Sequence, residues 1–564
     1  MYHLRSISIL LVLSIFSGFW LKCNQQPTSA NAEKLPETVQ HEENISSSQV
    51  WASDKTHNVI AEISIDNAVL RITPGTTVQF QNNGAISVGN GGGLIADGSD
   101  QPIIFSSNLA EKGAWKYIHF SDHSVDDSCQ LINCQIEYGG GDNNFGSFIY
   151  CENASPTITG CTINQCPSTG ITLAGDCRGI KIYNNTISNC GFVPIQTYAC
   201  NVSSIDTNTY VDNQLNQIRI IEGSVTFKDR WRNRSVPYRI ADGLKIKNAT
   251  LTIDPAVQMI FEYEEGATIS DGGSLKAVGN QTERITFTGS DIGRWTGFVF
   301  NASANDISSS LVYCVIENGG QDNERPANIV LDNSSPEISN CLIRQSIGYG
   351  VYISGKLRPG RFINNVIEHN TFAPICVSAR GVSGLQPGTY FDNGTNVIEV
   401  RGTPSEEPIT EDGFWDKLRM PFRVYGTIQI QSATLILAPG IELEMAEHSG
   451  FDISTAGGLI ADGSSEMIEI AGVQSTSGIW DHIYFGNYAN ASNCQLIRCH
   501  ISYGGGDTNR PGMIFCDNVS PIIRNCSIES SQTYGIYLNG NCEITDLQSN
   551  FFVDNGYGNY YKTP

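Results

Sequence analysis

The chain has 564 residues, and 57 acidic against 34 basic side chains give it a formal net charge of −23 at pH 7. A charge of this sign repels the phosphate backbone, so we expect no nucleic-acid partner. Apolar residues make up 40% of the chain, which is enough for a large core. Gly, Asn and Ser are frequent, and the chain shows no long helical pattern.

Residues 1–23, MYHLRSISILLVLSIFSGFWLKC, have the layout of an export signal, with Arg5 ahead of an apolar run that ends at Leu21. The run is shorter than the ~20 apolar residues of a membrane-crossing helix. No later stretch comes close to that length. We therefore expect an extracytoplasmic protein that meets a membrane only through an N-terminal lipid anchor.

Cys23 closes the signal, and residues 24–50 follow it as a predicted disordered polar linker. This arrangement resembles the lipidated cysteine and tether of bacterial surface lipoproteins, which implies lipidation at Cys23. Leu21 and Lys22 stand where that family has small residues. Ordinary secretion is therefore the alternative to an outer-surface lipoprotein.

The rest of the chain repeats itself three times, as residues 51–227, 228–411 and 412–564. Equivalent positions are spaced by 180 and 185 residues, and the third copy ends before its last segment. The matched sets are Trp115, Trp295 and Trp480; Cys134, Cys314 and Cys499; Pro156, Pro336 and Pro521; and Gly170, Gly350 and Gly535. Searching for such periods precedes any assignment of single elements. We predict three homologous modules, the last one truncated, in one continuous rod.

A shorter period runs inside each module. Ile136, Ile163 and Ile187 lie 27 and 24 residues apart. The other modules repeat that spacing at Ile316, Ile343 and Ile367 and at Ile501, Ile528 and Phe552. Short β-branched runs at this period predict a chain that coils, so that each strand pairs with its equivalent one turn later.

The phrases that carry this pattern are PG…V.F…GGLIADGS and C.IE.GGG. They resemble the right-handed parallel β-helix repeat proteins of bacterial cell surfaces, which share the coil of pectate lyases. The resemblance covers roughly residues 51 to 560 and implies an all-β fold, a right-handed parallel β-helix or solenoid.

The chain has 17 cysteines, and their pattern favours packing in the core. Cys134 and Cys161 share the inward face with the isoleucine column. Module 2 has leucines at two positions where its siblings have cysteines, namely Leu331 for Cys151 and Cys516, and Leu357 for Cys177 and Cys542. Disulfides between neighbouring coils are the alternative. No Cys-x-x-Cys pair occurs, so we predict no metal site.

The resemblance also implies an enzymatic alternative, a polysaccharide lyase or glycoside hydrolase, because such enzymes share the coil. One stretch breaks the repeat with acid–base side chains: His119, Asp122, His123, Asp126 and Asp127. Two histidines four residues apart on an extended strand lie about 13 Å from each other, too far to share one ion. The competing interpretation is a polar solvated loop. Calcium enters only with the lyase alternative, and we otherwise predict no cofactor.

Each module also carries a glycine-rich phrase that ends in aspartate, and these phrases are the predicted binding residues. Glycines permit positive φ and have no side chain, so the backbone itself forms a flat surface. The side chains offered to sugar hydroxyls and faces are Asp142 and Phe145, Asp322 and Arg325, and Asp507 and Arg510. One interpretation is a shallow recognition groove repeated along the rod at module spacing. The other is a turn that the coil geometry requires.

These observations predict a non-enzymatic protein, secreted or anchored at the surface, that presents an extended face for adhesion or carbohydrate binding. Its expected partner is a polysaccharide or cell-surface glycan. A fold does not determine a function, so the enzyme and a structural spacer stay as alternatives.

Overall fold

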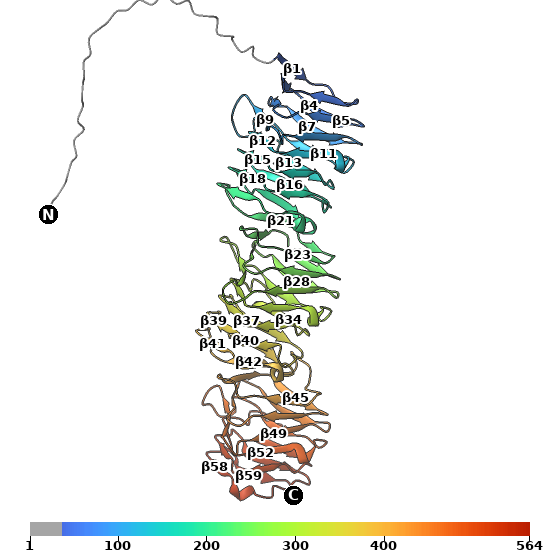
Figure 1. Cartoon of the computed structure of the whole chain (residues 1–564). Helices are drawn as coiled ribbons and strands as arrows, with labels where there is room; N and C mark the ends of the chain where they lie inside the picture. The colour runs from blue at the N-terminus through green and yellow to red at the C-terminus, as the bar shows by residue number, and fades with distance from the viewer. Residues whose placement is uncertain (1–36) are drawn as a thin grey trace, which may run out of the picture.

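The computed structural model describes residues 37–564, which form a parallel β-solenoid of about 21 turns. Figure 1 shows the strands stacked along a rod from β1 to β59. Each turn contributes three short strands, and each strand pairs in parallel with its equivalents in the turns before and after it. The all-β right-handed parallel β-helix expected from the sequence is confirmed.

The predicted signal, with Cys23, lies outside the described residues, whereas the predicted linker at 24–50 reaches into them. Here the prediction of disorder is wrong for residues 37–50. Strand β1 (Glu37–His41) pairs with β3 (Lys55–Val59), and β2 (Gln49–Trp51) pairs with β5 (Val69–Ile72). The rings of His41 and His57 both stack against the buried ring of Trp51, at centroid distances of 4.1 and 4.9 Å, and their nitrogens Nε2 and Nδ1 are 2.9 Å apart. The polar segment therefore gains packing that its composition does not suggest.

Within residues 37–564, no helix has the length and apolar character to cross a membrane.

The isoleucine column forms a single file through the core. Ile136 of β12 (Cys134–Glu137) pairs with Ile163 of β15 (Thr162–Asn164), which pairs with Ile187 of β18 (Thr186–Ser188). The equivalent columns of modules 2 and 3 stack in the same way. Because equal side chains lie over one another, every coil continues the apolar interior of the last.

Thiols extend this core. All sixteen cysteines of residues 37–564 are free, and all but Cys200 are buried. Leu331 and Leu357 are buried at their equivalent positions in module 2. Burial raises the pKa of the Cys151 and Cys516 thiols well above the usual value. In this state the cysteines act as small apolar side chains.

Equivalent strands of the three modules lie in different sheets. Strand β12 belongs to an 8-stranded sheet, β33 (Cys314–Glu317) to a 14-stranded sheet and β53 (Cys499–Ser502) to a second 14-stranded sheet. The longer strands that follow them shift in the same direction: β13 (Ser147–Glu152) lies in the first 14-stranded sheet, β34 (Ala327–Asp332) in the second, and β54 (Gly512–Asp517) in a 6-stranded sheet. With three sheets around the coil, each module is turned by about one third of a revolution from the previous one.

The shift arises at the module junctions. After β21 (Ile218–Glu222) the first 14-stranded sheet continues directly into β24 (Tyr238–Ile240). The short strand β22 (Ser224–Val225), between them in sequence, begins the second 14-stranded sheet. Each module thus contains whole turns and one third more. The three glycine-rich loops, although repeated at module spacing, therefore point in three directions around the rod.

Candidate binding surfaces

The glycine-rich loops are shaped by the tryptophans beneath them. The indole N–H of Trp115 donates to the carbonyl of Glu137, 2.8 Å away, and the same bond recurs from Trp295 and Trp480. Gly140 has a φ of +84°, and a β-carbon on Gly141 would meet the Gly113 carbonyl at 2.2 Å. The turn and the ring therefore account for these glycines, whatever else the loop does.

The predicted aspartates hold the same loops in shape. One carboxylate oxygen of Asp142 accepts the backbone N–H groups of Asn144 and Phe145, at 2.8 and 3.1 Å. Asp322 repeats both bonds, and Asp507 accepts the N–H of Asn509 at 2.9 Å. This is the Asx-turn role of aspartate, which leaves the second carboxylate oxygen of each side chain outside the turn.

The side chain three positions after each loop aspartate packs on the outer side of the sheet, and its contacts differ in each module. Phe145 packs against the rings of Tyr117, His119 and Tyr150, with centroids 4.5 to 4.8 Å away. In module 2, Arg325 instead pairs with Asp332 at 3.0 Å. The three loops therefore share a backbone and present different chemistry.

Module 3 places its arginine in a mixed cluster. The Arg510 guanidinium lies 4.0 Å from the centroid of Tyr484, and its Nη1 is 3.1 Å from Nε2 of His482. Burial, and then the positive charge of Arg510, lower the pKa of His482 to about 4. Burial also raises the pKa of Asp452, in the preceding coil. The histidine is therefore neutral at pH 7.

Beyond Arg510 an aromatic row continues along the same sheet: Tyr484, Phe515, Tyr537 and Tyr561, with successive centroids 5.8, 5.0 and 5.1 Å apart. The planes of Phe515 and Tyr537 differ by only 7°. Rings stacked in this way cover each other's faces, and Arg510 covers the first. The row therefore stabilises module 3 more than it offers ring faces to a ligand.

The predicted acid–base residues do not come together. His119 on β10 (Ile118–Phe120) is buried, with Ser87 Oγ 3.2 Å from its Nδ1 and Glu152 3.7 Å from its Nε2. Asp122, His123 and Asp127 are exposed at the corner that follows β10, and Asp126 accepts the N–H of Ser155 at 2.7 Å. Asp306 makes the equivalent bond in module 2, which identifies the Asp126 contact as architectural. Residues 37–564 contain no group of three His, Cys, Asp or Glu side chains placed to hold a metal.

A depression that the sequence analysis missed lies on the outer side of the second 14-stranded sheet. It has a volume of about 400 Å³, and we call it the aromatic depression. Tyr349 begins β37 (Tyr349–Ser354), Glu399 and Arg401 lie on β42 (Ile398–Arg401), and Tyr425 ends β44 (Phe422–Tyr425). Phe372 enters from the loop after β39 (Val366–Glu368). The other lining residues are Thr371, Gly394 and Thr395.

Hydrogen bonds fix the floor of the aromatic depression. The Tyr349 hydroxyl donates to Glu399 at 2.8 Å and accepts from Arg401 Nη2 at 3.3 Å. Arg401 Nε donates to the sulfur of Cys376 at 3.0 Å. Burial raises the pKa of Tyr349 far above its usual value, and that of Cys376 to about 12. The floor is therefore a preorganised set of donors and acceptors.

Two rings border this floor, with Phe372 42% exposed and Tyr425 39% exposed. Rings beside a few oriented polar groups are what a site for a polyhydroxylated ligand requires. The equivalent positions in module 1 include Thr169 for Tyr349 and Arg219 for Glu399. Departure of module 2 from module 1 at these positions was the one sequence signal that could have found the depression.

Comparison with known proteins concerns the coil. A family model described as a right handed beta helix region matches residues 116–281, less than a third of the chain. No curated protein and no solved structure matches the sequence. The match agrees with the observed solenoid and carries no information on the ligand.

Proposed function

We propose that the protein is a non-enzymatic binding rod, secreted or anchored at the cell surface, whose partner is a polysaccharide or cell-surface glycan. The observation that carries the proposal is the aromatic depression. Sugars present apolar C–H faces and a rim of hydroxyls. The rings of Phe372 and Tyr425 suit the faces, and Glu399 and Arg401 suit the hydroxyls.

The glycine-rich loops are secondary contacts in this proposal. In module 3, Asp507 keeps one carboxylate oxygen outside its turn, and half-buried Arg510 lies over Tyr484. In module 1, Phe145 is packed among neighbouring rings. Because the loops face three directions, one flat surface can meet only one of them at a time. A rod of this kind suits glycan chains that surround it better than a planar layer.

Binding to a glycan array and to insoluble polysaccharides, using intact protein, tests the proposal. Replacing Phe372 and Tyr425 together by alanine should weaken binding of the best ligand at least about tenfold, since buried aromatic contacts dominate such interfaces. Phe414→Ala is the matched control, because that ring is 48% exposed on a different sheet. Release of shortened products would favour the enzyme. Absence of both binding and products would favour the spacer.

The extracytoplasmic location rests on residues 1–23, which lie outside the described part. Mass spectrometry of the processed protein distinguishes a lipid on Cys23 from a free new N-terminus. A full-length chain in the cytoplasmic fraction would contradict export.

A further inference from the structure

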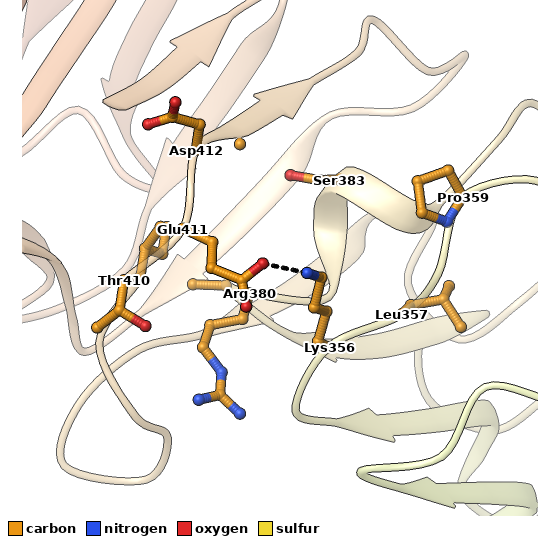
Figure 2. Close-up of a pocket in the computed structure, with 11 residues that line it drawn as sticks. Lys356, Leu357, Pro359, Arg380, Ser383, Thr410, Glu411 and Asp412 are labelled. Carbon is orange, nitrogen blue, oxygen red and sulfur yellow. Dashed lines mark hydrogen bonds and ion pairs between the residues drawn. The ribbon is translucent and has the colours of Figure 1, made fainter. Parts of the chain in front are cut away.

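A second cavity lies at the junction of modules 2 and 3, and we call it the seam pocket. Its volume is about 300 Å³. Buried Leu357, Ala379 and Ile409 provide apolar walls, and the charged side chains of Lys356, Arg380, Glu411 and Asp412 surround them. Figure 2 shows the Lys356 ammonium and the Glu411 carboxylate facing each other, joined by an ion pair, below Ser383.

The equivalent junction between modules 1 and 2 shows what the pocket lacks. Val225 pairs with Ile246 at the first junction, as Ile409 pairs with Ile430 at the second. With that register, Glu411 corresponds to Phe227. Phe227 is partly buried, and its centroid is 4.7 Å from the Arg178 guanidinium. A ring therefore occupies the first junction at the position where the second has a carboxylate.

The charges at the two junctions differ as well. Lys356 corresponds to Asp176, and Arg380 to Cys200. Trp231 and Trp415 are 184 residues apart, whereas Ile218 and Ile398 are 180 apart, so the second junction carries four extra residues. The added segment brings Glu407, which pairs with Arg380. The second junction has thus lost a ring and gained two cations, each of which is paired with a carboxylate, Glu411 or Glu407. In addition, Asp412 stands where module 1 has Lys228.

We propose that the seam pocket binds a small aromatic carboxylate. The ligand ring takes the place that Phe227 has at the first junction, against Leu357 and Ile409. The ligand carboxylate replaces Glu411 at Lys356. The replaced ion pair contributes little, because its side chains are 55% and 70% exposed.

Polar atoms at the rim fit this ligand. Ser383 Oγ accepts the N–H of Phe414 at 3.1 Å, which leaves the Ser383 hydroxyl proton free to donate. Arg380 Nε is buried without a hydrogen-bond partner. Asp412 accepts the N–H of Thr434 at 2.7 Å, so this bond fixes one of its carboxylate oxygens. The Ser383 hydroxyl and Arg380 Nε are therefore two donors at the rim that a ligand carboxylate can satisfy.

Phenylacetate is the probe for this proposal, tested on the intact protein by calorimetry and ligand-observed NMR. Benzyl alcohol supplies the ring without the charge, and acetate supplies the charge without the ring. We expect saturable phenylacetate binding, with each partial probe weaker by about tenfold or more. Glu411→Phe, which restores the module 1 residue, should abolish binding. Lys356→Met should remove the preference for phenylacetate over benzyl alcohol.

Lys417→Met is the matched control, because Lys417 pairs with Glu466 outside the pocket and its loss should change nothing. A dissociation constant above about 10 mM for phenylacetate overturns the proposal. So does equal affinity in a folded Glu411→Phe variant. If that variant does not fold, protection of Lys356 from acetylation by phenylacetate in the unmodified protein decides, and lack of protection counts against the pocket.

Discussion

A β-carbon on Gly139 would lie 2.5 Å from Cε2 of Trp115. The same closeness recurs between Gly504 and Trp480, where the nearest atom of the indole would be 2.6 Å away. In both modules the ring is fully buried and tied by its N–H to the strand that ends just before the loop. The glycine-rich sequence therefore recurs because a buried indole ring lies directly beneath the backbone of each loop and leaves no room for a β-carbon.

Gly504→Ala should lower the free energy of unfolding by about 3 kcal/mol, because overpacking forces the backbone or the indole to move. Gly360→Ala is the control, since the added carbon meets no atom within 4 Å there, and Gly360, unlike Gly504, has a positive φ of 76°. We expect the control to cost about 1 kcal/mol from its backbone conformation alone. Thermal unfolding measures both, and equal losses would refute the packing argument.

The sequence was sufficient for the coil because a parallel stack places equal residues over one another. The regular spacing of the isoleucines is sufficient to predict this stacking, as for Ile136, Ile163 and Ile187. The same logic covers the thiols, since a leucine that replaces a cysteine in a sister module marks an apolar position. Residues 37–50 escaped it because they lie ahead of the first module, and their strands are recognised only by pairing with β3 and β5 inside that module.

The sequence was insufficient for the surface. A spacing of 180 residues does not reveal a fractional turn when single coils vary in length, so the rotation between modules could not be inferred. The aromatic depression escaped for a related reason, because Tyr349, Phe372 and Tyr425 meet only through three neighbouring coils. Side chains on the outer surface need not be equal from coil to coil, so their spacing in the sequence does not show which of them lie close together.

The rotation itself predicts a visible arrangement. Biotin introduced through a clickable residue at two of the exposed positions Asn143, Asn323 and Thr508 should direct two streptavidins away from the rod in different directions. Electron microscopy of single rods carrying two such labels at once measures the angle between them. We expect about one third of a turn for adjacent modules. Labels on one side of the rod would contradict the sheet assignment.

Asn185→Ala should destabilise module 1 by about 2 kcal/mol. The buried Asn185 carboxamide accepts the Cys161 N–H at 2.9 Å and donates to the Ile158 carbonyl at 2.9 Å. Alanine leaves both backbone groups buried without a partner. Hydrogen exchange should show faster exchange at Cys161 in particular. Asn143→Ala, at an exposed loop position, should leave exchange and stability unchanged. A similar loss in both variants would argue against the role of the buried Asn185 hydrogen bonds.

Stability should fall as pH drops from about 6.5 to 4, in part because of His482. Its folded-state pKa is about 4, lowered by burial and by Arg510 against the attraction of Asp507, whereas an unfolded histidine titrates near 6.5. Between these values the unfolded chain binds the extra proton, so the stabilisation is complete above pH 6.5 and lost on acidification. For this buried ring the contribution is about 3 kcal/mol.

His482→Gln should flatten this part of the pH dependence without removing it, because burial also lowers the pKa of His41 to about 4. Unfolding midpoints between pH 4 and 7 for His482→Gln, His41→Gln and the double variant separate the contributions of the two histidines to the pH dependence. If His482→Gln follows the parent protein across this range, His482 has the same pKa in the folded and unfolded states, and the lowering of its pKa by burial and Arg510 would be wrong.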